Sequence, residues 1–175
     1  MKRKNYFNFY NKIKKHFKGI YKACGNKFFY SCGSYLINGK SYKYDKEMLN
    51  KQLLLYNIVE KHKTVLEIGV YMGHSILIML SSNPRLSIYG IDIDKKFALP
   101  SINYLKKNFP KSNLKFLEGD SIKILNKLKK KFDLFHIDGD HKTAKIYNEI
   151  VACAKLAKNK NMKILFDDAD MMKSI

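Results

Sequence analysis

Residues 65–75 read VLEIGVYMGHS and carry the main signal for the fold. An apolar run is followed by two glycines, Gly69 and Gly73, four positions apart, and then by a stretch with helical periodicity. Such a run ending in glycine is typical of a buried strand that enters a tight turn. The segment therefore predicts a strand, a glycine loop and a helix that begins near His74.

The same alternation continues beyond this segment. Further apolar runs, each followed by an amphipathic stretch or by the end of the chain, are SIYGIDI (87–93), LKFLEGD (114–120), FDLFHID (132–138) and MKILFDD (162–168). Helices are expected from about Lys95, over 121–128 and over 144–157. Parallel neighbours need crossover connections, so five strands alternating with helices predict an α/β fold: a parallel sheet covered by helices on both faces.

The first 44 residues are expected to form a basic helical appendage, followed by one domain at 45–175. They contain ten lysines and Arg3 but no acidic residue. Their apolar residues recur every three or four positions, which predicts an amphipathic helix; they are Phe7, Tyr10, Ile13, Phe17, Ile20 and Cys24. We favour an accessory helix packed on the domain over a helix that adheres to an anionic membrane or partner. A second helix, over 46–61, is expected to cover the sheet.

Composition narrows the function classes. The chain has 34 Lys+Arg against 15 Asp+Glu, a net charge of +19. Only Arg3 and Arg85 are arginines, the residue best suited to phosphate and guanine, so nucleic acid is not the favoured partner. Three cysteines without metal-ligand spacing, and the lack of a secretory signal, predict a cytoplasmic protein. No apolar run approaches the roughly 18 residues of a transmembrane segment.

Polar residues follow each expected strand, at the edge where such sheets bind ligands. They are Glu67 with Gly69 and Gly73; Asp92 with Asp94; Asp120; Asp138 with Asp140 and His141; and Asp167 with Asp168. A turn or helix cap explains any one of these groups, because aspartate and glycine favour turns. Five groups in succession indicate a ligand site.

The glycine loop suits an adenosyl cofactor better than a dinucleotide. Tyr71 stands where the dinucleotide fingerprint needs a glycine, and Glu67 suits a ligand with an ammonium and a sulfonium. Asp92 follows Gly69 by 23 residues, where a carboxylate can accept hydrogen bonds from ribose hydroxyls. Asp120 and Ser121, after the third strand, are candidates for contacts to adenine, with helix capping as the alternative.

The order EIGxxxGxS, YGIDID, LEGDS and FDLFHIDGDH resembles class I S-adenosylmethionine (SAM)-dependent methyltransferases. The similarity spans about residues 46–170, and IDGDH resembles the macrocin and caffeoyl-CoA O-methyltransferase subgroup. The resemblance implies a Rossmann-like, doubly wound sheet of strand order 3-2-1-4-5 with SAM as cofactor. The expected cofactor-binding residues are Glu67, Gly69, Tyr71, Gly73, Ser75, Asp92, Asp120 and Ser121.

The resemblance also implies a divalent metal held by Asp138, Asp167 and Asp168. Converging carboxylates repel one another unless a cation or protons intervene, and oxygen ligands favour Mg²⁺. The metal would orient an acceptor hydroxyl and lower its pKa. Asp138, Asp140 and His141 are therefore the expected catalytic residues, with Asp140 or His141 accepting the proton. The alternative is that these residues only cap helices and turns.

Members of the resembled family usually add a sixth and a seventh strand, whereas this sequence ends at Ile175, just after the fifth. We therefore expect a domain truncated relative to the family. An open edge on the fifth strand would need cover from the appendage, from a second copy in a homo-oligomer or from a completing partner chain.

The favoured function is SAM-dependent O-methylation of a small hydroxylated acceptor, such as a sugar or a phenol, with assistance from Mg²⁺. The alternative is a catalytically weak or inactive SAM-fold binding module that acts through its basic N-terminal segment. A nucleic-acid methyltransferase would need a motif such as NPPY or DPPY after the fourth strand, where IDGDH stands instead.

Overall fold

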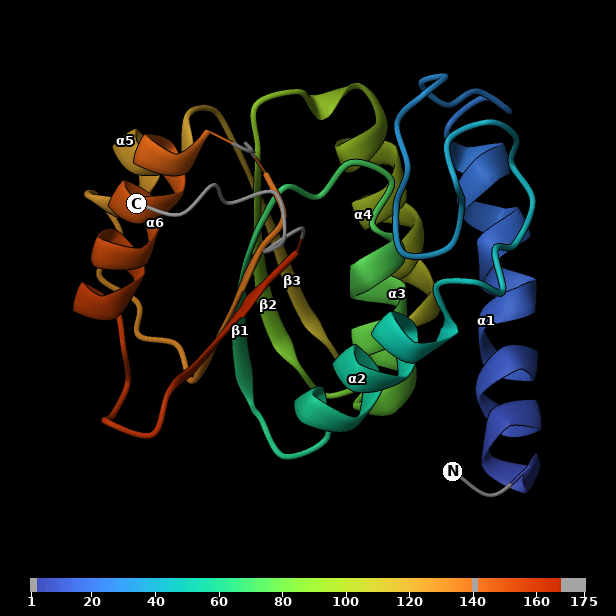
Figure 1. The fold of residues 1–175 in the computed structure, drawn as a ribbon, viewed down its shortest axis with the longest axis horizontal. Helices are drawn as coiled ribbons and strands as arrows, with labels where there is room; N and C mark the ends of the chain where they lie inside the picture. The colour runs from blue at the N-terminus through green and yellow to red at the C-terminus, as the bar shows by residue number, and fades with distance from the viewer. Residues whose placement is uncertain (1–2, 140–141, 168–175) are drawn as a thin grey trace.

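The computed structural model describes residues 3–139 and 142–167, in which a central sheet is layered with helices (Figure 1). The strands of this part are β1 (Thr64–Ile68), β2 (Ser87–Asp92), β3 (Asn113–Glu118), β4 (Leu134–Ile137) and β5 (Lys163–Phe166). They lie in the order β3-β2-β1-β4-β5, and every neighbouring pair is parallel. The predicted α/β fold and its strand order are confirmed.

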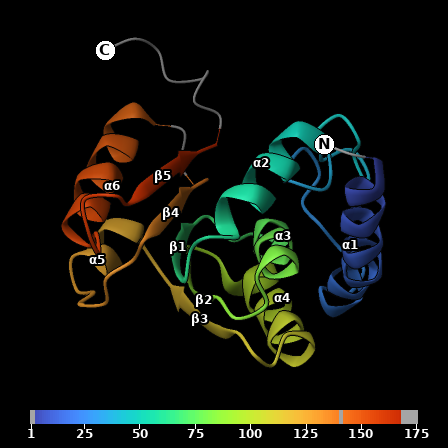
Figure 2. The same cartoon turned by 90° about the horizontal axis from the view of Figure 1, so that it is seen from below.

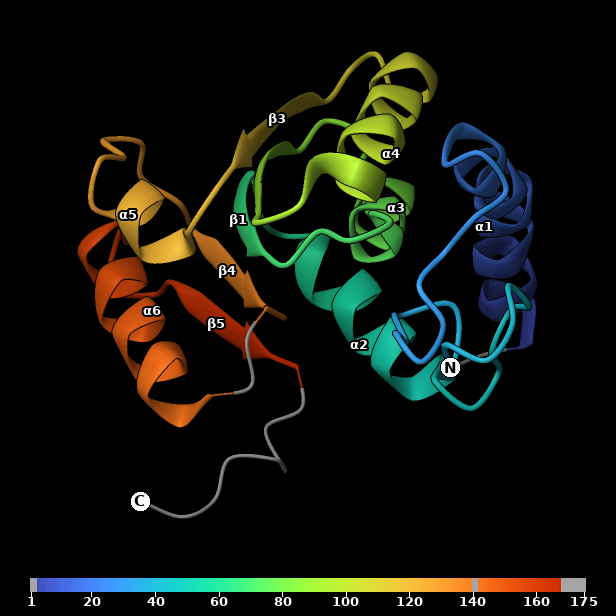
Figure 3. The ribbon, with the colours of Figure 1, turned by 90° about the horizontal axis from the view of Figure 1, so that it is seen from above.

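Helices cover both faces of the sheet (Figures 2 and 3). One face carries α2 (Leu49–Val59), α3 (His74–Ser82) and α4 (Lys95–Asn108), with α1 (Arg3–Ala23) outside them; the other carries α5 (Ser121–Leu125) and α6 (Thr143–Lys155). Helix α2 begins three residues later than expected from the sequence. Asp45 accepts a hydrogen bond from the Glu47 amide there (2.8 Å), and this local turn precedes the helix.

Helix α1 is packed into the main hydrophobic core. Ile13, Phe17 and Ile20 are buried in the same cluster as helix α3, whose residues from His74 to Ser81 are all buried. Because α3 is apolar on most of its sides, other elements must shield most of its surface from water. Helix α1 supplies the outer layer over α3 and α4 (Figure 3). The predicted amphipathic helix is confirmed, with its apolar face turned into the protein; the side chain of Phe7 lies outside the described residues.

The division of the chain into an appendage at 1–44 and a domain at 45–175 stays a prediction.

Among the described residues, none of the helices combines the length and apolar character that crossing a lipid bilayer requires.

Residues 28–37, here called the strap, connect the α1 side of the molecule to the site. Tyr35, Leu36 and Ile37 of the strap are buried. Gln52 of α2, fully buried, donates a hydrogen bond to the Tyr35 carbonyl (2.7 Å) and accepts one from the Tyr44 hydroxyl (2.6 Å). Because buried amides must find partners, Gln52 fixes the strap to α2.

We expect Ile20→Ala to lower the free energy of unfolding by about 2–5 kcal/mol, because it leaves a cavity between α1 and the helices beneath it. Urea unfolding followed by circular dichroism measures the change. Lys18→Ala, at an exposed position of the same helix, is the matched control and should stay within about 0.5 kcal/mol of the parent. Equal stability of the two variants would contradict the packing role of α1.

Candidate functional site

The loop between β1 and α3 lies directly against the loop that follows β4. Gly69 has φ +87°, and a Cβ atom at this position would lie 1.9 Å from the carbonyl oxygen of Asp138. No side chain fits in that space, and L-residues rarely adopt this φ. The glycine predicted from the sequence is therefore required by a close approach of two backbone segments.

Asp92, at the end of β2, holds the glycine loop in shape. Its Oδ2 atom accepts hydrogen bonds from the amides of Val70 (2.9 Å) and Tyr71 (2.7 Å), and its Oδ1 atom accepts one from Asp94 (3.0 Å). Tyr71 has φ +45°, a conformation uncommon for residues other than glycine. The two loop amides donate to one charged oxygen, which compensates for that conformation.

A first cavity of about 320 Å³ opens at the carboxyl ends of β1 to β3. Gly69 and Asp92 both line it, as does Ser121, whose hydroxyl donates to Glu149 of α6 (2.5 Å). Asp120 is not among the lining residues; its carboxylate accepts a hydrogen bond from the Lys123 amide (3.0 Å) and caps α5. The first cavity therefore combines a carboxylate with an apolar wall from Ile68, Ile91 and Ile93.

A second cavity of about 350 Å³ lies on the other side of the same loops, with the strap forming one of its walls. Its lining includes Ser31 to Tyr35 of the strap, together with Tyr71, Ser75, Asp138 and Asp167. Gly69 and Gly139 line both cavities. The two spaces are therefore neighbours along one edge of the sheet, separated where the two loops meet.

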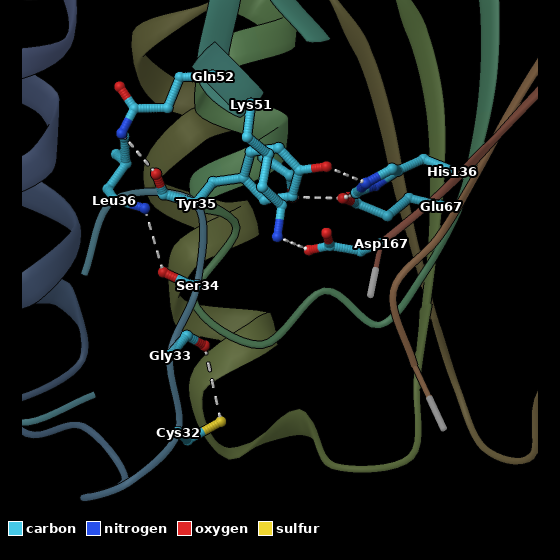
Figure 4. Close-up of polar contacts among 11 residues, drawn as sticks. Cys32, Gly33, Ser34, Tyr35, Leu36, Lys51, Gln52, Glu67, His136 and Asp167 are labelled. Atoms are coloured by element: carbon cyan, nitrogen blue, oxygen red, sulfur yellow. Dashed lines mark hydrogen bonds and ion pairs between the residues drawn. The ribbon is translucent and has the colours of Figure 1, made fainter. Parts of the chain in front are cut away.

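Beneath the second cavity lies a buried polar chain (Figure 4). The Tyr35 hydroxyl contacts His136 Nε2 (2.8 Å), and His136 Nδ1 contacts Glu67 Oε1 (2.9 Å). Ser75 donates to the same Glu67 oxygen, while Glu67 Oε2 has no hydrogen-bond partner among the described residues. Burial lowers the pKa of His136, but the hydrogen bond and charge of Glu67, with the charges of Asp138 and Asp167, raise it overall.

Two carboxylates and one ammonium meet at the ends of β4 and β5. Asp167 forms an ion pair with Lys51 of α2. Burial, together with the charge of Asp167, raises the pKa of Asp138 to about 8, although the charges of His136 and Lys51 act in the opposite direction. Asp138 therefore holds a proton more readily than an exposed aspartate does.

The structure gathers most of the predicted site residues around the two cavities. Gly69, Tyr71, Ser75, Asp92, Ser121, Asp138 and Asp167 line them. Glu67 lies below Ser75, Gly73 is the N-cap of α3, and Asp120 is the N-cap of α5. Asp140, His141 and Asp168 lie outside the described residues.

Sequence analysis missed Tyr35, Lys51, His74 and His136. The sequence did contain a signal for His136. It lies two residues before the strand-end residue Asp138, and Glu67 lies two residues before the strand-end residue Gly69, so the two side chains occupy equivalent positions on their strands. Residues two apart on a strand share a face, and Glu67 and His136 are partners in the register of β1 and β4. No motif marks the strap or Lys51.

A family model described as "Methyltransferase domain" matches residues 66–169. This span includes the glycine loop and the strand ends just described. The chain belongs to this methyltransferase family. The resemblance to class I SAM-dependent methyltransferases is thereby confirmed, and comparison with curated protein sequences gives no match.

Solved structures share the fold of this methyltransferase domain. An O-methyltransferase from Bacillus cereus in complex with S-adenosylhomocysteine (SAH) is 16% identical, with TM-score 0.62, covering 87% of this chain and 66% of its own. An SAH-bound methyltransferase from Podospora anserina is 18% identical, with TM-score 0.63, covering 95% and 70%. A Staphylococcus aureus protein assigned as a caffeoyl-CoA O-methyltransferase is 17% identical, with TM-score 0.57, covering 67% and 56%. The chain thus spans 56–70% of their lengths.

The residues of the methyltransferase domain fit the cofactor of its class. SAM carries an adenosine at one end and an ammonium near a sulfonium at the other. Asp92 supplies acceptor oxygen in the first cavity, and Asp138 supplies a carboxylate in the second. Below Ser75, the buried Glu67 is paired with His136 and keeps one oxygen without a partner among the described residues. The donor set therefore suits an elongated, cationic nucleoside ligand.

The described residues do not by themselves fit a divalent metal. Within 3–139 and 142–167, no group of three His, Cys, Asp or Glu side chains is placed to share an ion. Of the predicted ligands, Asp138 and Asp167 lie in this part, and Asp167 is already paired with Lys51. The third, Asp168, lies outside it, so the metal stays a prediction.

We expect the free energy of unfolding to fall faster in the parent than in His74→Gln as the pH drops below 6.5. His74 Nδ1 contacts the Ser34 hydroxyl (2.5 Å), His74 Nε2 contacts the Tyr42 hydroxyl (2.9 Å), and burial lowers the pKa of His74 from 6.5 to about 3. Between these values the unfolded chain binds a proton that the folded protein does not, so stability is lost as pH falls. The difference should be roughly 1.4 kcal/mol per pH unit. Parallel curves in urea unfolding would contradict a neutral, buried His74.

Proposed function

We propose that the protein binds SAM across the two cavities and transfers its methyl group to the oxygen of a small hydroxylated acceptor, such as a sugar or a phenol. The supporting observation is that Gly69 and Gly139 line both cavities while Asp92 faces one and Asp138 the other. A ligand with an adenosine end and a charged end needs this pair of adjoining spaces. The family match supports the reaction class.

In this proposal Asp92 has two roles. Its Oδ2 atom holds the loop amides, and the remaining lone pairs of the carboxylate accept hydrogen bonds from the ribose hydroxyls. Ser121 and the isoleucines of the first cavity contact the base. Ser75 and Tyr71 in the second cavity lie beside the methionine end of the ligand.

The bound cofactor supplies a methyl group attached to a positively charged sulfur. An acceptor oxygen bound beside it would take this methyl carbon, and the electron pair of the broken carbon–sulfur bond would stay on sulfur. The acceptor proton goes to a nearby base. Asp138 is the described candidate, because it lines the second cavity and its pKa is raised to about 8. Asp140 and His141 remain the alternative bases predicted from the sequence.

We expect isothermal titration calorimetry to detect SAH binding with a micromolar dissociation constant, and Asp92→Asn to weaken it about tenfold. Asparagine retains one acceptor oxygen for the loop but loses charge toward the ribose. The matched control is Asp94→Asn, because Asp94 caps α4 outside both cavities and asparagine is an equally good cap. Absence of SAH binding by the folded parent would remove the proposal. Binding without methyl transfer to any acceptor would favour the binding-module alternative.

We also expect SAH to protect Cys32 from N-ethylmaleimide. Cys32 is exposed and lines the second cavity, whereas Cys24 and Cys153 are buried. Burial and the charges of Asp138 and Asp92 raise the pKa of Cys32, so labelling is done above neutral pH, where more thiolate is present.

Mass spectrometry of intact protein gives the labelling rate, and Cys32→Ser measures the background from the buried cysteines. The rate should fall about tenfold at saturating SAH. Unchanged labelling by a protein that binds SAH would place the ligand away from the second cavity.

A further inference from the structure

Lys51 brings a positive charge from α2 to the ends of β4 and β5 (Figure 4). Its ammonium pairs with Asp167, and the two side chains are 30% and 10% exposed. It also lines the second cavity. A partly buried ion pair at the wall of a cavity is screened less than a surface pair, so its charge acts on whatever the cavity binds.

The position of the ammonium is fixed from two directions. Lys51 Nζ lies 4.7 Å from the ring centroid of Tyr35, within the range of a cation–π interaction. Tyr35 is itself buried, with its hydroxyl against His136. The residue that follows Lys51, Gln52, fixes the strap and thus the Tyr35 ring. The ammonium is therefore held by the same contacts that place the strap at the cavity wall.

The Lys51 ammonium lies at the same cavity wall as the carboxyl groups of Asp138 and Asp167. It pairs directly with Asp167, and Asp138 lines the same cavity. A divalent ion between these carboxylates would lie close to the lysine charge. Like charges a few ångströms apart repel, and this cost falls on metal binding.

We propose that the Lys51 ammonium serves as the cation of the acceptor site in place of a divalent metal. The inference rests on the proposed function, because the cation matters to catalysis only if an acceptor binds in the second cavity. A lysine ammonium has three N–H donors on a flexible stem, so it can pair with Asp167 and also donate to an acceptor oxygen. There it stabilises negative charge on that oxygen as the proton leaves.

Mn²⁺ binding followed by electron paramagnetic resonance tests the proposal without any assay of activity. The free ion gives a strong six-line spectrum that weakens when Mn²⁺ binds protein. The parent protein should leave Mn²⁺ free at concentrations where Lys51→Met binds it, with the dissociation constant of the variant lower by about tenfold or more. Methionine is an unbranched side chain one atom shorter than lysine, and it carries no charge.

Two further variants complete the design. Lys46→Met removes an exposed lysine just before α2 and should behave as the parent does. Lys51→Arg keeps the charge and should also leave Mn²⁺ free. Circular dichroism confirms that each variant folds. If Lys51→Met does not fold, Mn²⁺ binding is compared among the parent, Lys51→Arg and Asp167→Asn, and this comparison still tests the proposal. Micromolar Mn²⁺ binding by the parent that Asp167→Asn abolishes would overturn the proposal.

SAH calorimetry separates this inference from the proposed function. With the proposal correct, EDTA leaves the SAH affinity and the methyl-transfer rate of the parent unchanged. Absence of SAH binding removes the proposed function but leaves the Mn²⁺ result intact. Normal SAH binding with methyl transfer that requires added Mg²⁺ removes the inference alone.

Discussion

The contact between Gly69 and the backbone of Asp138 sets the geometry of the whole carboxyl edge of the sheet. β1 and β4 are hydrogen-bonded neighbours, and the ladder continues to the Asp138 amide, which donates to the Ile68 carbonyl (2.8 Å). Beyond this bond the loops touch so closely that no side chain fits at position 69. The ligand space is thereby divided into two parts that share a glycine boundary. A larger residue at this boundary would push the loops apart and disrupt both cavities at once.

The buried Glu67–His136 pair ties this edge to the strap. Removing an ionisable pair from water costs free energy, which is recovered only when the remaining polar atoms find partners. Tyr35 and Ser75 supply two of those partners, and Tyr35 comes from a segment 101 positions away in sequence from His136. The strap is thus required by the sheet beneath it as well as by the cavity beside it. Because Gln52 fixes the strap to α2, the placement of Lys51 follows from the same set of contacts.

The fold could be predicted from the sequence because strand and helix periods alternate and glycines mark the turns. Site residues that come directly after strands were also predictable, since parallel strand ends meet at one edge; Asp92, Asp138 and Asp167 are examples. Asp120 gave the same signal as Asp92 yet caps a helix, because one aspartate side chain serves either role and local sequence does not separate them. The strap has no periodic pattern, and its hydrogen bonds to His74 and His136 join residues that are distant in sequence. Lys51 was hidden among many lysines and is distinguished only by its tertiary partners.

The local charge of the two cavities is set by the ionisable residues that line them and not by the net charge of +19. At physiological ionic strength, exposed charges farther than about 8 Å apart are largely screened, so most lysines act weakly on the cavities. Asp92 acts at close range in the first cavity, whereas Glu67 is paired with His136 and burial raises the pKa of Asp138 in the second. A cationic cofactor is therefore compatible with a strongly basic protein. The same reasoning makes Lys51 exceptional, because among the described lysines it lines the second cavity and is paired with a carboxylate there.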